Sequence, residues 1–167
     1  MSGWRLAQMN VGTLLYPTGD PRVAGFMGAL DEINALAEAS PGFVWRLQSA
    51  SGNATDIKTS DDPNFIVNMS LWESADSLFD FVYKTAHRLV MAQRRDWFAK
   101  PERAYMVLWW VPAGTVPSVE EGLARLAHLE AHGPSAHAFT FKAKFPPPDE
   151  SGGGADMGPE PWCVGWR

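Results

Sequence analysis

Residues 71–98 read LWESADSLFDFVYKTAHRLVMAQRRDWF, and this stretch decides the fold more than any other. An apolar strand ends at Trp72, and Ser74 is placed to cap a helix that begins immediately afterwards. Apolar residues then recur at helical spacing for more than six turns. The pattern predicts one helix over residues 74–99.

The same signals define the elements on either side of this helix. Asp20 followed by Pro21 is a helix start, and Ser118 with Glu121 has the capping-box pattern. Runs of apolar or alternating residues predict strands, the last of which we expect to be half exposed. The predicted order is strand 4–12, helix 20–39, strand 43–49, strand 64–72, helix 74–99, strand 105–111, helix 118–133 and strand 137–145.

The first six elements have the βαββαβ order of an α+β, ferredoxin-like fold, in which two helices cover one face of an antiparallel sheet. The other face of such a sheet is uncovered, and an exposed apolar face needs a partner. We therefore expect a homodimer that packs sheet to sheet. Residues 1–145 are expected to form one domain with an extra C-terminal helix and strand, and residues 146–167 a Pro/Gly-rich tail.

Composition narrows the classes of partner. Apolar residues make up 46% of the chain and charged residues 20%, which is typical of globular proteins. The net charge of −5 argues against nucleic acid, because phosphate binding needs a basic face. Cys163 is the only cysteine, and no signal peptide or membrane-spanning segment is evident. We expect a cytoplasmic protein that binds neither nucleic acid nor membrane.

The long helix suggests a reactive pocket. At about 100° per residue, Tyr83, His87 and Arg94 fall together at one edge of its apolar stripe. As a general base, His87 could take a proton from a phenol or enol, with Tyr83 orienting it and Arg94 holding the anion. His87 could instead ligate a haem iron, or be a boundary histidine bonded to a neighbour.

Five stretches carry a resemblance to a known family, and the resemblance covers about residues 6–145. Together they resemble the family called domain of unknown function 3291, whose members look like the antibiotic-biosynthesis monooxygenases of the dimeric α/β-barrel superfamily. The stretches are LAQMN, FVWRLQ, SLWES, YKTAHRLVMAQRRDWF and YMVLWWVPAGTVPSVEEGLARLAHLEAHG.

The resemblance implies a cavity between the sheet and its own helices. Members of the wider superfamily include cofactor-independent oxygenases of activated aromatic substrates, and haem proteins. The leading hypothesis is a small-molecule pocket protein that oxygenates an apolar or aromatic compound without a cofactor. The alternatives are a haem protein ligated by His87 and a non-catalytic dimeric binding module. Beside the three catalytic candidates, the expected substrate-binding residues are Asn10, Asn68, Trp72, Trp97 and Trp109.

No metal site is expected. His128 and His132 have the i, i+4 spacing that can seat a metal, but no Cys or well-placed Asp completes a site. The sequence also lacks the glycine-rich nucleotide-binding, nucleophile-elbow and HExxH motifs.

Overall fold

A computed structural model describes residues 3–49, 52–55 and 60–148 of the chain. Cys163 and all of the tail from residue 149 lie outside the described residues. None of the described helices is long and apolar enough to cross a membrane. The elements are β1 (Trp4–Thr13), η1 (Pro21–Val23), α1 (Ala24–Ala39), β2 (Phe43–Arg46), β3 (Phe65–Trp72), α2 (Ala75–Lys84), α3 (His87–Ala92), α4 (Arg94–Trp97), β4 (Met106–Pro112) and α5 (Val119–His132).

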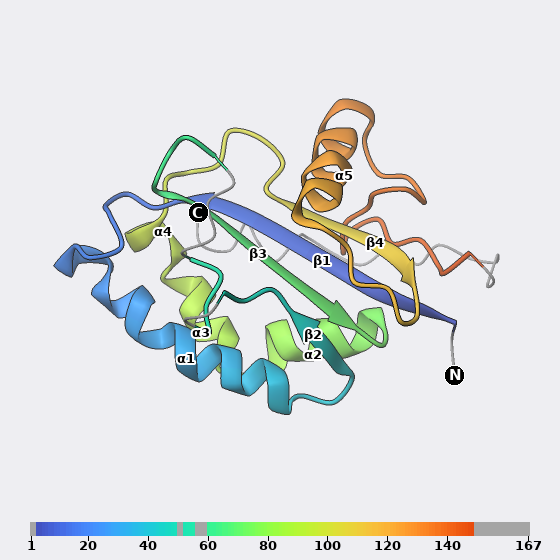
Figure 1. Cartoon of the computed structure of the whole chain (residues 1–167), viewed down its shortest axis with the longest axis horizontal. Helices are drawn as coiled ribbons and strands as arrows, with labels where there is room; N and C mark the ends of the chain where they lie inside the picture. The colour runs from blue at the N-terminus through green and yellow to red at the C-terminus, as the bar shows by residue number, and fades with distance from the viewer. Residues whose placement is uncertain (1–2, 50–51, 56–59, 149–167) are drawn as a thin grey trace.

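The four strands form one antiparallel sheet in the order β2-β3-β1-β4, which confirms the predicted ferredoxin-like fold (Figure 1). The central pair is β1 with β3, where Leu6 lies opposite Trp72 and Asn10 opposite Asn68. Side chains alternate between the two faces of a strand, so Leu6, Gln8 and Asn10 share one face. Helices α1 to α4 lie over that face.

The predicted helix starts are confirmed. Asp20 accepts a hydrogen bond from the backbone N–H of Arg22, so the chain turns through η1 into α1. Ser74 Oγ accepts from the N–H of Ser77 at 3.1 Å, and Ser118 Oγ accepts from Glu121 at the same distance. Each cap satisfies an N–H group that the first helical turn leaves without a partner.

The single helix predicted over residues 74–99 is wrong, because the chain breaks into α2, α3 and α4. Thr85 has an extended backbone, with φ −116° and ψ 178°, and its hydroxyl bonds to the carbonyl oxygen of Phe81. A β-branched residue with a backbone-bonding hydroxyl is a weak helix former, and here it ends α2. The break turns α3 so that His87 stands at its first position.

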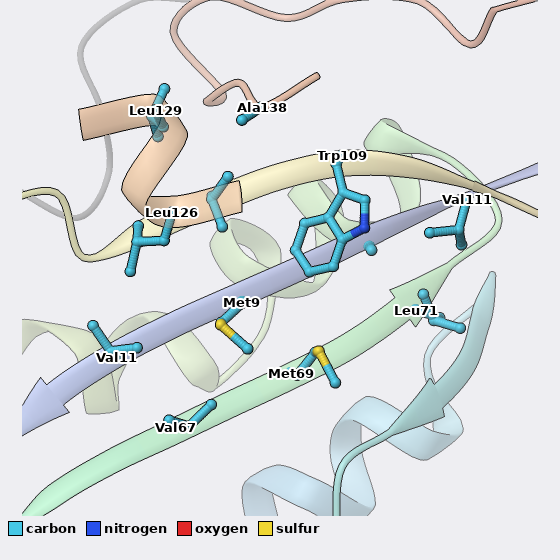
Figure 2. Close-up of a cluster of buried hydrophobic side chains, with 12 residues drawn as sticks. Met9, Val11, Val67, Met69, Leu71, Trp109, Val111, Leu126, Leu129 and Ala138 are labelled. Atoms are coloured by element: carbon cyan, nitrogen blue, oxygen red, sulfur yellow. The ribbon is translucent and has the colours of Figure 1, made fainter. Parts of the chain in front are cut away.

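The prediction of an uncovered sheet face is also wrong. Helix α5 packs on the face opposite α1–α4, and Figure 2 shows Leu126 and Leu129 in one cluster with the sheet residues Met9 and Trp109. Gly122 permits this approach, since a Cβ atom there would lie 2.3 Å from Cε of Met9. The apolar residues of this face are buried within one chain: Ala7, Met9, Val67, Met69, Leu71, Val107 and Trp109.

The predicted fifth strand over residues 137–145 does not form. Phe139 exchanges two backbone hydrogen bonds with Leu108 of β4, at 2.8 and 2.9 Å, and this bridge is isolated. Ala138, Phe139, Thr140 and Phe141 are all buried in succession, so the segment does not alternate between a wet and a dry side. It covers the outer edge of β4 at Leu108, which hinders the pairing of that edge with another chain.

Candidate functional site

A cavity lies between the sheet and helices α1, α3 and α4, on the side that the sequence resemblance implied. Its larger compartment leaves about 120 Å³ that the centre of a water molecule can occupy, and the adjacent smaller one about 60 Å³. This is room for a small organic molecule rather than for one water. The two compartments share six lining residues: Asn10, Ile33, Asn34, Arg46, Asn68 and His87.

Helix α1 forms the apolar wall of this cavity. Phe26, Leu30 and Ile33 line the larger compartment, and all three are only half buried. An apolar stripe that packed directly on a sheet would be fully buried. The incomplete burial therefore reflects the space that separates α1 from the strands.

The sheet forms a polar floor. Asn10 of β1 lies directly opposite Asn68 of β3, and Gln8 lies opposite Ser70. The side chain of Asn68 is exposed, whereas Gln8 and Ser70 are buried. Apolar walls with a few convergent polar groups are typical of small-molecule sites.

A chain of hydrogen bonds joins these polar residues to Trp72. The indole Nε1–H of Trp72 donates to Ser70 Oγ at 2.9 Å, and this hydroxyl donates to Gln8 Oε1 at 3.1 Å. Gln8 Nε2 then donates to Asn10 Oδ1 at 2.8 Å. The chain ends at the side-chain amide of Asn10, which lines both compartments.

Arg94 brings a buried positive charge to the larger compartment. Its side chain is 8% exposed, and Nη2 donates to the carbonyl oxygen of Val11 at 3.2 Å. The guanidinium lies over the rings of Phe98 and Tyr105, at 4.7 and 5.1 Å from their centroids. Burial lowers the pKa of Arg94, although a guanidinium stays protonated in proteins.

No carboxylate among residues 3–49, 52–55 and 60–148 pairs with Arg94, and its buried Nε has no hydrogen-bond partner there. A buried charge without a counter-ion costs folding free energy. Gly12 makes room for this arrangement, since a Cβ atom there would lie 3.1 Å from Nη2 of Arg94 and 2.7 Å from Phe98. Arg94 therefore gives the site a positive charge and N–H groups that a ligand can accept hydrogen bonds from.

His87 stands at the boundary of the two compartments. Burial lowers its pKa to about 4, against the opposing effect of a hydrogen bond from the imidazole to the backbone of Val82, so the imidazole is neutral at pH 7. Its Nδ1 is buried without a partner in the described part of the chain, and its ring packs 4.8 Å from that of Phe81. A neutral imidazole can accept a proton or ligate iron, so haem ligation stays a prediction.

The structure separates the residues that the sequence grouped together. His87, Arg94 and Trp97 line the larger compartment, and Trp72 lines the smaller one. Tyr83 lines neither, because it packs with its ring centroid 4.2 Å from that of Phe79.

Trp109 lies on the other face of the sheet, in the cluster beneath α5, so it does not line the cavity (Figure 2). The side chains of adjacent residues on a strand point to opposite faces, and Trp110 accordingly belongs to the opposite cluster.

Among the residues of the site that were not selected from the sequence are Gln8, Gly12, Arg46 and Ser70. For Gln8 and Ser70 the sequence does contain a signal, which is the alternation of polar and apolar residues along residues 6–12 and 66–72. Gln8 and Asn10 fall on one face of their strand, as Asn68 and Ser70 do on theirs. Only the antiparallel register brings these four side chains together.

The histidines of α5 lie near a third histidine, His137. The ring of His128 lies 4.6 Å from both His132 and His137. No group of three or more His, Cys, Asp or Glu residues that could hold a metal occurs in the described part of the chain.

A family model matches residues 5–153 and carries the description domain of unknown function 3291. The chain belongs to this family. The polar floor, the buried Arg94 and the neutral His87 described above are therefore features of a member of domain of unknown function 3291. No curated protein matches it.

Several solved structures resemble this member of the family at low sequence identity. SnoaB, described as a cofactor-independent oxygenase from Streptomyces nogalater, is 17% identical, with 68% of this chain and 98% of that chain covered and a TM-score of 0.44. NE2512, a protein of unknown function from Nitrosomonas europaea, is 14% identical over 70% and 97%, with a TM-score of 0.43. PA3566 from Pseudomonas aeruginosa is 13% identical over 69% and 98%, with a TM-score of 0.44.

Proposed function

We propose that this protein binds a small aromatic or apolar molecule with an acidic O–H or C–H group and removes that proton in the cavity. The observation that carries the proposal is a buried guanidinium without a carboxylate partner that lines the same compartment as a neutral imidazole. A pocket with this pairing favours a ligand that is neutral on entry and anionic after proton transfer.

His87 is the proton acceptor in this scheme. A base with a pKa of about 4 is weak, so it removes a proton only from a group whose anion is stabilised in the site. Arg94 supplies that stabilisation with its fixed positive charge in a site of low dielectric. The amides of Asn10 and Asn68 can hold the same oxygen by hydrogen bonds.

The resulting anion can react with molecular oxygen, which is the oxidoreductase activity that the sequence resemblance implies. The carbanion adds O₂ to give a peroxide, which loses water and leaves a carbonyl group. In balance, a CH₂ group and O₂ give C=O and H₂O: carbon loses four electrons, one oxygen atom enters the carbonyl and the other enters water. The proton on His87 leaves with that water.

An oxygen electrode tests this function with a panel of naphthols and enolisable aryl ketones. We expect oxygen uptake with the wild type and a fall of about 100-fold or more for His87→Ala, since a positioned base contributes on the order of 100-fold or more. His132→Ala is the control, because His132 is exposed on the other side of the sheet. Uptake unchanged by His87→Ala rejects the role of His87 as base.

The homodimer and the cytoplasmic location expected from the sequence belong to this proposal and are not needed by its chemistry. With α5 on the second sheet face, one apolar surface left for a partner copy is near β2, where Trp45 is partly buried and Val44 is exposed. A mass of twice 18.4 kDa by light scattering supports a dimer, and Trp45→Arg should then return the mass to that of a single chain.

A non-catalytic binding module is the outcome if the compounds of the panel bind without oxygen uptake.

A further inference from the structure

We infer that the hydrogen-bond chain from Trp72 through Ser70 and Gln8 fixes the direction of the Asn10 side chain, so that Asn10 presents N–H groups to the cavity and selects a ligand with an acceptor atom there. This inference rests on the cavity being a ligand site, as proposed above, and not on any reaction with oxygen. It names Trp72, Ser70 and Gln8 as positioning residues.

Trp72 sets the donor-to-acceptor direction of the hydrogen-bond chain. An indole N–H can only donate, so Ser70 Oγ must accept from it. Ser70 then has its own proton to give, and the acceptor within reach is Gln8 Oε1 at 3.1 Å. This assignment orients the Gln8 amide with its NH₂ group toward Asn10.

The reversed direction leaves a buried donor without a partner. If the Gln8 amide turned over, its Nε2 would donate to Ser70 Oγ, which would then accept two hydrogen bonds. The Ser70 proton would have no acceptor among the described residues, in a side chain that is 8% exposed. Leaving a buried donor unsatisfied costs more than the average hydrogen bond contributes, so the observed direction is strongly preferred.

The fixed orientation of the Gln8 amide determines which end of the Asn10 amide faces the cavity. Its Oδ1 is occupied by Gln8 Nε2 at 2.8 Å, and its Nδ2 has no hydrogen-bond partner within the described ranges. Asn10 lines both compartments, and Arg94, which can only donate, lines the larger one. The ligand atom that meets Asn10 is therefore an acceptor, such as a carbonyl, carboxylate or enolate oxygen.

Two neutral probes of similar shape test this selectivity. The nitrogen of 2-naphthonitrile only accepts hydrogen bonds, whereas the amino group of 2-naphthylamine donates them. By isothermal titration, we expect the wild type to bind the nitrile about tenfold more tightly, as one lost or unmade hydrogen bond implies. Equal affinity of the wild type for both probes overturns the inference.

Gln8→Met removes the link to Asn10 with a side chain of similar volume, and Trp72→Phe removes the donor at the far end. Both should lower the nitrile-to-amine ratio at least threefold, because Asn10 can then turn its oxygen toward the ligand. Trp110→Phe is the matched control: this indole also donates a hydrogen bond, to the carbonyl oxygen of Phe145 at 2.8 Å, but lines neither compartment. A ratio that Trp72→Phe and Trp110→Phe change equally overturns the role of Trp72.

A measurement without ligand separates the failure of this inference from the failure of the proposed function. If neither probe binds, the ligand site is rejected, and with it the claim of acceptor selectivity. The hydrogen-bond chain is then judged by NMR exchange of the Gln8 side-chain amide protons. Faster exchange in Trp72→Phe but not in Trp110→Phe supports the fixed direction, and identical exchange in the two variants rejects it.

Discussion

Nη2 of Arg94 donates a hydrogen bond to the carbonyl oxygen of Val11, and this contact connects α4 to β1. The contact uses one of the five N–H groups of the guanidinium. Because no carboxylate in the described ranges neutralises Arg94, its charge is available to a ligand in the cavity.

Arg94→Met should separate ligand binding from stability. We expect affinity for 2-naphthoate to fall about 10-fold to 100-fold, since a charge-assisted hydrogen bond is lost, while affinity for the uncharged 2-naphthamide changes less than threefold. Because the substitution removes an uncompensated buried charge, the free energy of unfolding should stay within about 1 kcal/mol of wild type or rise. A large loss of stability, or equal loss of affinity for both compounds, contradicts the role assigned to Arg94.

His87 should make the protein less stable as the pH falls. Its folded pKa of about 4 lies below the ordinary value of 6.5, so the unfolded chain takes up the proton first. The contribution of His87 to the free energy of unfolding is therefore complete above pH 6.5 and is lost between about pH 6.5 and pH 4. The slope is at most about 1.4 kcal/mol per pH unit.

Urea unfolding at pH 7.5, 6.0 and 5.0 measures this dependence. His87→Gln, which cannot titrate, should show a flatter profile over the same range than the wild type. Parallel profiles for the two proteins would mean that the imidazole titrates normally in the folded state. The assignment of a neutral buried base would then fail.

Gly122→Ala tests the packing of α5 on the sheet. A Cβ atom would lie 2.3 Å from Cε and 2.8 Å from Sδ of Met9, so either the buried Met9 side chain or α5 must shift, and we expect a loss of about 1–3 kcal/mol in the free energy of unfolding. Gly28→Ala in α1 is the control, because no heavy atom lies within 4 Å of its Cβ position and alanine favours a helix by about 1 kcal/mol. Thermal unfolding should move the two variants in opposite directions, and a Gly122→Ala protein as stable as Gly28→Ala would contradict the close packing of Gly122 on Met9.

Haem binding has a visible test. Purified protein titrated with hemin should show a Soret band that His87→Ala shifts or abolishes if His87 ligates iron. The acid-binding account given above predicts instead that the spectrum of added hemin is the same with wild type and His87→Ala. A Soret band that depends on His87 would favour the haem alternative.

The order and starts of the main elements could be predicted because their signals are local. Caps at Asp20, Ser74 and Ser118 and the alternation along β1 and β3 depend on residues within a few positions of each other. The break at Thr85 could not be predicted, since the apolar periodicity continues through it unchanged. Competition from the Thr85 hydroxyl for a backbone carbonyl decides the outcome there.

The candidate site could be predicted only in part, for a related reason. His87, Arg94, Asn10 and Asn68 were selected, and all four line the cavity. Trp109 was placed correctly on a strand, but the sequence does not say which face of the sheet meets the cavity and which meets α5. Gln8 and Ser70 are 62 positions apart in the sequence, and their pairing depends on the register of β1 with β3.

The most direct test of the central claim, that the helix-side cavity is a site for acidic aromatic ligands, is an NMR titration of the isotope-labelled protein with 2-naphthoate. We expect saturable shifts in the side-chain signals of Asn10, Asn68, His87 and Arg94, and in Arg94→Met the shifts of the first three should need about 10-fold to 100-fold more ligand to saturate. Shifts confined to the open groove beside Thr140 and Lys142, or no saturable shifts at any of the four cavity residues, would contradict the account.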